Sequence, residues 1–229
     1  MQGQSLIAAA GVALVAPLLC KGWQALENFE TVRLPVLGVP DGPYLAQASS
    51  EGLAAFEKQL TLLEDAGYTV RRMTAMEDIE AINHRHMRMV FAEMALVHVE
   101  WFAQYASLYS TRTTEAIREG QEVGTEELAE CRASRSLLRQ DLNRLMKQNG
   151  IDLWVCPSAP GAAPEGINTT GNSIMNLPWT HAGLPAISLP AGQAENGLPL
   201  GLQCIGASAA DEYVVAWSER LAEILKATA

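Results

Sequence analysis

The side chains best suited to binding or catalysis gather in one Gly- and Pro-rich stretch, residues 152–206. This stretch carries little charge and contains apolar runs rich in β-forming residues, which is typical of shaped loops laid over a buried sheet. In open α/β sheets, ligands bind in the loops at the carboxyl ends of the strands. The same residue types also satisfy backbone groups in turns and cap short helices, so residue type alone leaves both roles open. The hydroxyl and amide side chains concerned are Ser158, Thr169, Thr170, Asn176, Thr180 and Ser188.

A complete nucleophilic site is not predicted by any short motif. The nucleophile elbow Gly-x-Ser-x-Gly does not occur, nor do the Gly-rich motifs that bind nucleotide phosphates. The pair Ser49-Ser50 has no flanking Gly-Gly and is typical of a helix N-cap. Cys156 ends an apolar run, and thiolate activation needs a cationic or metal neighbour, so we expect an inert thiol there. We therefore predict no catalytic residue.

Metal ligation is not expected either. His84 and His86 are two residues apart, which places them on different faces of a helix, and the other two histidines stand alone in the sequence. The four cysteines show no CxxC spacing and are typical of reduced, buried thiols in a cytosolic protein. We predict no metal, no cofactor and a cytoplasmic location. The isolated histidines are His98 and His181, and the cysteines besides Cys156 are Cys20, Cys131 and Cys204.

The charge balance restricts the possible partners. Sixteen Lys and Arg residues against 26 Asp and Glu residues give a net charge of −10. A field of that sign repels phosphate backbones and anionic lipids, so we expect neither a nucleic-acid partner nor a membrane partner. The chain has 229 residues, 48% of them hydrophobic, which is enough for a sizeable core.

The elements that must position these residues follow from hydrophobic patterns. Short apolar runs predict strands, and a helix from Ser49-Ser50 to Gly67 joins the first two strands as a βαβ unit with a parallel pair. Asn196-Gly197 predicts a hairpin between the last two. We predict an α/β fold in which a mixed β-sheet is flanked by helices, with a helical segment inserted at roughly 77–148. The predicted strands are 34–40, 68–73, 151–156, 186–191 and 198–206.

Residues 5–20 form an uncharged and mostly apolar run. The run lacks the basic region of a signal peptide, and it is shorter than the roughly 20 residues that span a membrane. Gly11 and Pro17 also interrupt it. We expect a buried helix, and because its apolar residues lie on every side, something must cover it all round. A partner subunit over residues 5–20 is one possibility.

Three motifs in a fixed order carry a family resemblance: PSAPGAAP after the strand DLWV, then NLPWTHAGLPAISLPAG, then GLPLGLQCIG. Together they resemble the closing third of amidase-signature enzymes. Weaker similarity extends through the helical segment and VLGVPDGPYL to the N-terminal helix. The resemblance implies that residues 1–229 form the C-terminal part of an amidase-signature domain and correspond to the second half of a longer protein.

The resemblance implies a site with a Ser nucleophile, a bridging Ser and a Lys base. In this family, both serines lie in a Gly- and Ser-rich loop that also supplies the backbone amides of the oxyanion hole. No such loop is found in this sequence, and none of its lysines has a comparable setting. The expected triad is therefore missing, and we expect the chain alone to be inactive. The lysines are Lys21, Lys58, Lys147 and Lys226.

The resemblance implies hydrolysis of carboxamide C–N bonds, with this chain supplying the substrate-side wall of the cleft. Ile174 and Trp179 would be apolar contacts of a small-molecule amide, and Ser158, Asn176 and Thr180 polar ones. An N-terminal half would complete the site. Two alternatives stay open: a non-catalytic remnant or partner subunit, and an amidase subunit of the amidotransferase type.

Overall fold

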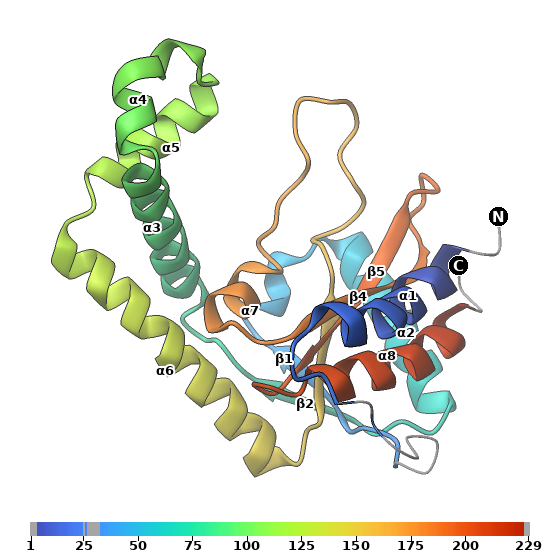
Figure 1. Cartoon of the computed structure of the whole chain (residues 1–229). Coiled ribbons are helices and arrows are strands. Elements are labelled where there is room, and N and C mark those ends of the chain that lie inside the picture. Colours follow the sequence, from blue (N-terminus) through green and yellow to red (C-terminus); the bar gives the residue numbers. More distant parts are fainter. Residues whose placement is uncertain (1–3, 25, 27–32, 227–229) are drawn as a thin grey trace.

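The computed structural model describes residues 4–24, 26 and 33–226. Its centre is a five-stranded mixed sheet in the order β2-β1-β3-β5-β4 (Figure 1). The strands β2, β1 and β3 run parallel, while β5 is antiparallel to both of its neighbours. The α/β prediction is confirmed, as is the parallel pair. The strands are β1 (Leu37–Asp41), β2 (Val70–Thr74), β3 (Leu153–Pro157), β4 (Ala186–Gln193) and β5 (Pro199–Gly206).

Helices pack on this sheet and extend away from it. The helix α2 (Ser50–Asp65) joins β1 to β2 and packs with α8 (Asp211–Leu225) on the sheet. Ser49 is the N-cap of α2, and its hydroxyl accepts a hydrogen bond from the Gly52 N–H, as the sequence predicted. The first helix, α1 (Gln4–Leu19), packs on α8 and β4.

The chain is mainly helical between β2 and β3, and most of this segment forms an arm that projects from the body (Figure 1). Its long helices pack against each other around a small apolar cluster of their own. The inner end of α6 reaches the main core through Leu142 and Met146. The helices of the arm are α3 (Ile79–Val97), α4 (Val99–Tyr105), α5 (Thr111–Gln121) and α6 (Thr125–Asn149).

The structure corrects the expectation that the N-terminal helix is buried. Among the residues of α1 whose side chains are described, only Ala16 is buried. Leu14, Leu18 and Leu19 are 74%, 82% and 77% exposed. The physical reason is that, among the described elements, α1 packs mainly on α8 and β4, which cover one side of it. Within the described part of the chain, no helix is both long and apolar enough to cross a membrane.

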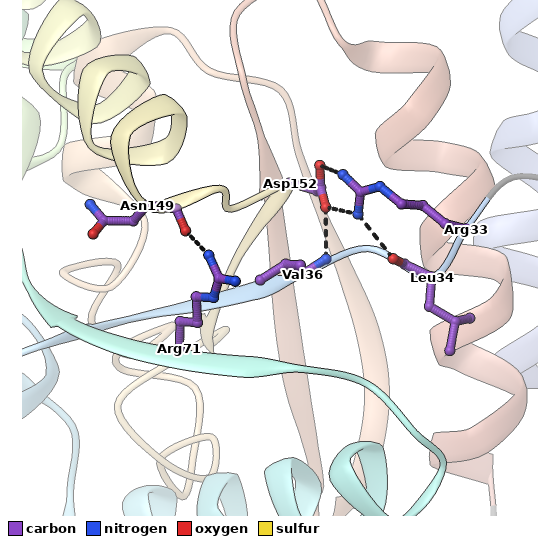
Figure 2. Close-up of polar contacts among 6 residues, drawn as sticks. All are labelled: Arg33, Leu34, Val36, Arg71, Asn149 and Asp152. Carbon is purple, nitrogen blue, oxygen red and sulfur yellow. Dashed lines mark hydrogen bonds and ion pairs between the residues drawn. The ribbon is translucent and has the colours of Figure 1, made fainter.

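Charged side chains tie the sheet together at the amino ends of its parallel strands (Figure 2). The Asp152 carboxylate, just ahead of β3, accepts a hydrogen bond from the Val36 N–H, with 2.7 Å between nitrogen and oxygen. It also accepts two hydrogen bonds from the Arg33 guanidinium, at 2.6 and 2.8 Å. Arg71 on β2 donates to the carbonyl oxygen of Asn149 at the end of α6. These contacts fix the entry of the chain into β1 and β3.

Candidate functional site

The candidate site lies where β1 and β3 end, at the carboxyl edge of the parallel strands. A long loop leaves β3 at Ser158, stands out from the body and returns at α7 (Leu177–Ala182) (Figure 1). Ligands bind at such an edge in many α/β proteins. The five predicted substrate contacts all belong to this loop and to α7, whereas the further candidate Ser188 lies on β4.

Two of the predicted polar residues meet at the base of the loop. The Asn176 side-chain amide donates to the carbonyl oxygen of Ser158 at 3.1 Å. Its own oxygen accepts from the Gln203 amide on β5 at 2.8 Å. The Ser158 side chain also packs closely on the backbone of β5, because a Cβ on Gly201 would lie 2.4 Å from the Ser158 hydroxyl. A side chain at position 201 would therefore force the Ser158 hydroxyl to turn away.

A second set of bonds lies beneath α7. The Trp179 indole N–H donates to the Tyr44 hydroxyl at 2.8 Å, and the rings meet edge to face with centroids 5.5 Å apart. The Tyr44 hydroxyl in turn donates to the Met175 carbonyl oxygen at 2.8 Å. Both aromatic side chains are buried, Trp179 at 1% exposure and Tyr44 at 0%. Tyr44 follows β1, so this set joins the β1 end to α7 across 135 residues.

The Cys156 thiol connects the two sets. Its Sγ lies 3.1 Å from the Tyr44 hydroxyl and donates to Gln203 Oε1 at 3.6 Å. Burial raises the pKa of Cys156 to about 12 and holds the pKa of Tyr44 well above its ordinary value. Both groups therefore stay protonated at neutral pH, and a thiol in that state is a weak nucleophile. We call Tyr44, Cys156, Asn176, Trp179 and Gln203 the neutral network.

The remaining predicted residues occupy different surroundings. Ile174 lines an open cleft of about 940 Å³, together with Gln47 and the first turn of α3. Ser158 lines a separate small pocket of about 40 Å³ against α2. Thr180 is exposed on the outer side of α7, whereas Trp179 points inward. The structure thus joins Ser158 to Asn176, while the side chains of Ile174 and Thr180 lie in other surroundings. The substrate contacts of all five predicted residues stay predictions.

Sequence reasoning missed Tyr44 and Gln203. Both carry polar groups in otherwise apolar surroundings: Gln203 interrupts the run LGLQCIG, and Tyr44 follows the turn Asp41-Gly42-Pro43. A polar side chain that faces the core must find a partner there, and this was the available signal.

The serine hydroxyls with described partners cap helices or contact a buried imidazole. Ser49 caps α2, Ser110 caps α5, and the Ser134 hydroxyl lies 2.7 Å from Nε2 of His181. Among the described residues, none of these serine contacts involves a lysine.

Comparison with known proteins assigns the class. A family model described as Amidase matches residues 25–215, which is most of the chain. The protein belongs to the amidase signature family, as its motifs suggested.

Individual relatives agree on the family. In Bartonella tribocorum, the A subunit of glutamyl-tRNA(Gln) amidotransferase is 26% identical over 209 residues, a match that covers 78% of this chain and 42% of the relative. The corresponding protein of a Cyanothece species is 40% identical over 79 residues, 31% of this chain and 16% of that protein. The chain therefore spans less than half the length of these curated relatives.

Solved structures share the fold. A crystal structure of an amidase superimposes with a TM-score of 0.80 at 26% identity, over 93% of this chain and 51% of that one. A vestigial protein complex connected with the origins of an s-triazine catabolic enzyme gives a TM-score of 0.69 at 18% identity, over 82% and 43%. Fatty acid amide hydrolase gives 0.72 at 16%, over 89% and 42%. The latter two show likeness of fold alone.

Proposed function

We propose that this chain is the substrate-side half of an amidase that hydrolyses the C–N bond of a small carboxamide. Membership of the amidase signature family supports the reaction class. The observation that carries the assignment is the neutral network, which braces the loop from Ser158 and α7 at the carboxyl ends of β1 and β3. A braced wall of uncharged groups suits a neutral amide, and the Ser nucleophile, bridging Ser and Lys base come from a segment outside these 229 residues.

Two surfaces support completion by a further segment. The outer side of α1 exposes Leu14, Leu18 and Leu19, and such contiguous apolar surface is uncommon on a monomer unless it binds something. Among the described strands, β4 lies at an edge of the sheet, and an edge strand can serve as a template for a further strand. We infer that the segment carrying the catalytic loop covers both surfaces, either as preceding polypeptide or as a partner subunit.

Active-site labelling tests the assignment. We expect a serine-directed fluorophosphonate probe to leave the purified chain unlabelled. The DNA ahead of the Met1 codon is then read for an in-frame or neighbouring segment that carries a Lys and a Gly/Ser-rich loop. Once that segment is co-expressed, we expect the probe to label a serine of the added segment and simple carboxamides to be hydrolysed. Labelling of any serine in the chain alone would contradict the proposal.

The glutaminase chemistry of an amidotransferase is a second candidate. The observation that favours it is the likeness to a component of glutamyl-tRNA(Gln) amidotransferase in two bacteria. In that case the completed protein releases ammonia from glutamine faster than it hydrolyses other carboxamides. Comparison of kcat/KM for glutamine with kcat/KM for short aliphatic and aromatic amides separates the two. A remnant without activity would hydrolyse neither, even when fully assembled.

A further inference from the structure

The helix α7 is held against α3 and α6 by two buried histidines that the proposed reaction does not use. His181 on α7 is 0% exposed, and His86 on α3 is 6% exposed. Their Nδ1 atoms lie 3.4 Å apart, and the rings meet edge to face. The other nitrogen of His181, Nε2, lies 2.7 Å from the hydroxyl of Ser134 on α6. Three elements of the fold therefore meet at these side chains.

The positions of the protons follow from one carbonyl group. The Ser134 hydroxyl has a single proton and donates it to the Cys131 carbonyl oxygen at 2.7 Å, since that oxygen can only accept. Ser134 must then accept from His181, which places the proton of His181 on Nε2. Its Nδ1 is left as an acceptor, so His86 must donate from Nδ1. This assignment also excludes a nucleophilic Ser-His pair, because the Ser134 proton points away from the imidazole.

This series of hydrogen bonds requires the His181 imidazole to be neutral, because its Nδ1 must accept from His86. A proton added to His181 Nδ1 would face the N–H of His86, and two donors would then oppose each other across 3.4 Å. The charges that act on the pair are cationic: Arg85 from α3 and Arg135 from α6. Burial, His86 and these two arginines lower the pKa of His181 to about 4. Burial and Arg135 also lower the pKa of His86.

The arginines of α6 have a second role at the same place. Arg135 donates to the carbonyl oxygen of His181 at 3.3 Å, and Arg139 donates to that of Ala182 at 2.6 Å. These are the carbonyl groups at the end of α7, which have no partner inside so short a helix. Two arginines of α6 thus bind the backbone of α7. The His181 side chain of α7 forms uncharged hydrogen bonds to α3 and α6.

We propose that His86 and His181 are positioning residues, which hold α7 and its Trp179 in place only while the His181 imidazole is neutral. This inference rests on the proposed function in one respect, namely that α7 walls the amide site. Protonation of His181 breaks its hydrogen bond with His86, which joins α7 to α3. Repulsion of the imidazolium by Arg85 and Arg135 then separates the elements. Neither histidine touches the substrate.

The direction of the pH effect follows from the lowered pKa values. An exposed histidine has a pKa of about 6.5, so the unfolded chain takes up protons before the folded chain does as the pH falls. The stability contributed by the neutral pair is therefore complete above about pH 6.5 and declines between pH 6.5 and about 4.

Imidazole NMR of the purified wild-type chain tests the proton assignment and needs no variant. At pH 7 we expect His181 as the Nε2–H tautomer and His86 as the Nδ1–H tautomer. A cationic His181 imidazole, or an Nδ1–H tautomer of His181, would overturn the inference.

The acid response is then followed through the ¹⁹F signal of 5-fluorotryptophan at Trp179. We expect a transition between pH 6.5 and 4 in the wild type. The double variant His86→Gln with His181→Gln can keep an amide–amide hydrogen bond but cannot titrate, so its midpoint should fall by about one pH unit or more. His84→Gln removes an exposed histidine two residues from His86 and should leave the midpoint unchanged. Equal midpoints in the double variant and the wild type would overturn the inference.

These readouts do not depend on amide hydrolysis. In the completed amidase, loss of the pair should raise KM more than it lowers kcat, because α7 positions substrate contacts and supplies no reacting group. A protein that shows the tautomers and the acid transition but cleaves no amide refutes the proposed function alone. A protein that cleaves amides, but whose Trp179 signal has the same acid transition with and without the two histidines, refutes the positioning role alone.

Discussion

The two ends of the strands β1 and β3 are held by different kinds of interaction. At the amino ends, Asp152 binds Arg33 and the Val36 N–H, and the Arg33 side chain is 64% exposed (Figure 2). At the carboxyl ends, the neutral network joins Tyr44 and Trp179 in the core, where neither exceeds 1% exposure. One end thus relies on charge at the surface, and the other on uncharged directional bonds inside.

This difference decides which end tolerates change. An exposed ion pair contributes little, because water and salt screen it and a lost partner is replaced by water. A buried network has no such replacement, so removal of one member leaves the desolvated polar groups of the others without partners. The end that carries the candidate site should therefore be the more sensitive to substitution and the less sensitive to salt.

The largest expected effect is that of Trp179→Ala. The substitution leaves a cavity beneath α7 and removes the donor to Tyr44, which should lower the free energy of unfolding by about 3–5 kcal/mol. Urea unfolding measures the change. In the completed amidase, we also expect the ratio of rates for aromatic and aliphatic amides to change. An unchanged ratio would show that the α7 wall does not shape the acyl site.

Tyr44→Phe should have the next largest effect. The ring keeps its edge contact with Trp179, but the indole N–H and the Met175 carbonyl group both lose their partner. Two buried unsatisfied groups together cost about 2–4 kcal/mol. Tyr68→Phe is a matched control in the same core. If Tyr44→Phe unfolded no more easily than Tyr68→Phe, the hydroxyl would not hold the site end.

The fold could be predicted from the sequence to a large extent because its signals are local. The residue types around Ser49 predict the cap of α2, and the Asn196-Gly197 turn predicts the β4–β5 pair. The helix from Ser49-Ser50 to Gly67, and thereby the β1–β2 crossover, follows from the helical spacing of Leu53, Phe56, Leu60 and Leu63.

The neutral network could not be predicted in the same way. Tyr44 and Trp179 are 135 residues apart in the sequence. They meet because β1 pairs in parallel with β3, which brings the segments that follow these two strands to the same edge of the sheet. No local pattern determines that pairing. Similarly, α7 has six residues, too few for a period that would show which side faces inward. Loop position therefore suggests Trp179 as a surface contact, whereas the structure places its indole in the core and leaves Thr180 outside.

A smaller effect is expected from Asp152→Ala at the amino ends of the strands. The Asp152 side chain is 17% exposed and accepts from the Val36 N–H as well as from Arg33. Its removal leaves that backbone N–H without an acceptor at the entry to β1, and we expect a loss of about 1–2 kcal/mol. Asp152→Asn is the matched control, since an amide oxygen can still accept from Val36. Equal losses in the two variants would mean that the charge matters and the backbone bond does not.

The smallest effect should come from Arg33→Ala, because this substitution removes only the exposed partner. Asp152 keeps its bond to Val36, and water takes the place of the guanidinium, so the loss should stay below about 1 kcal/mol. The difference between wild type and Arg33→Ala should shrink further in 1 M NaCl, where the Debye length falls to about 3 Å. The loss caused by Tyr44→Phe should not change with salt, since no charge is involved. A salt-dependent loss at Tyr44, or a salt-independent one at Arg33, would contradict the contrast between a charged end and a neutral end.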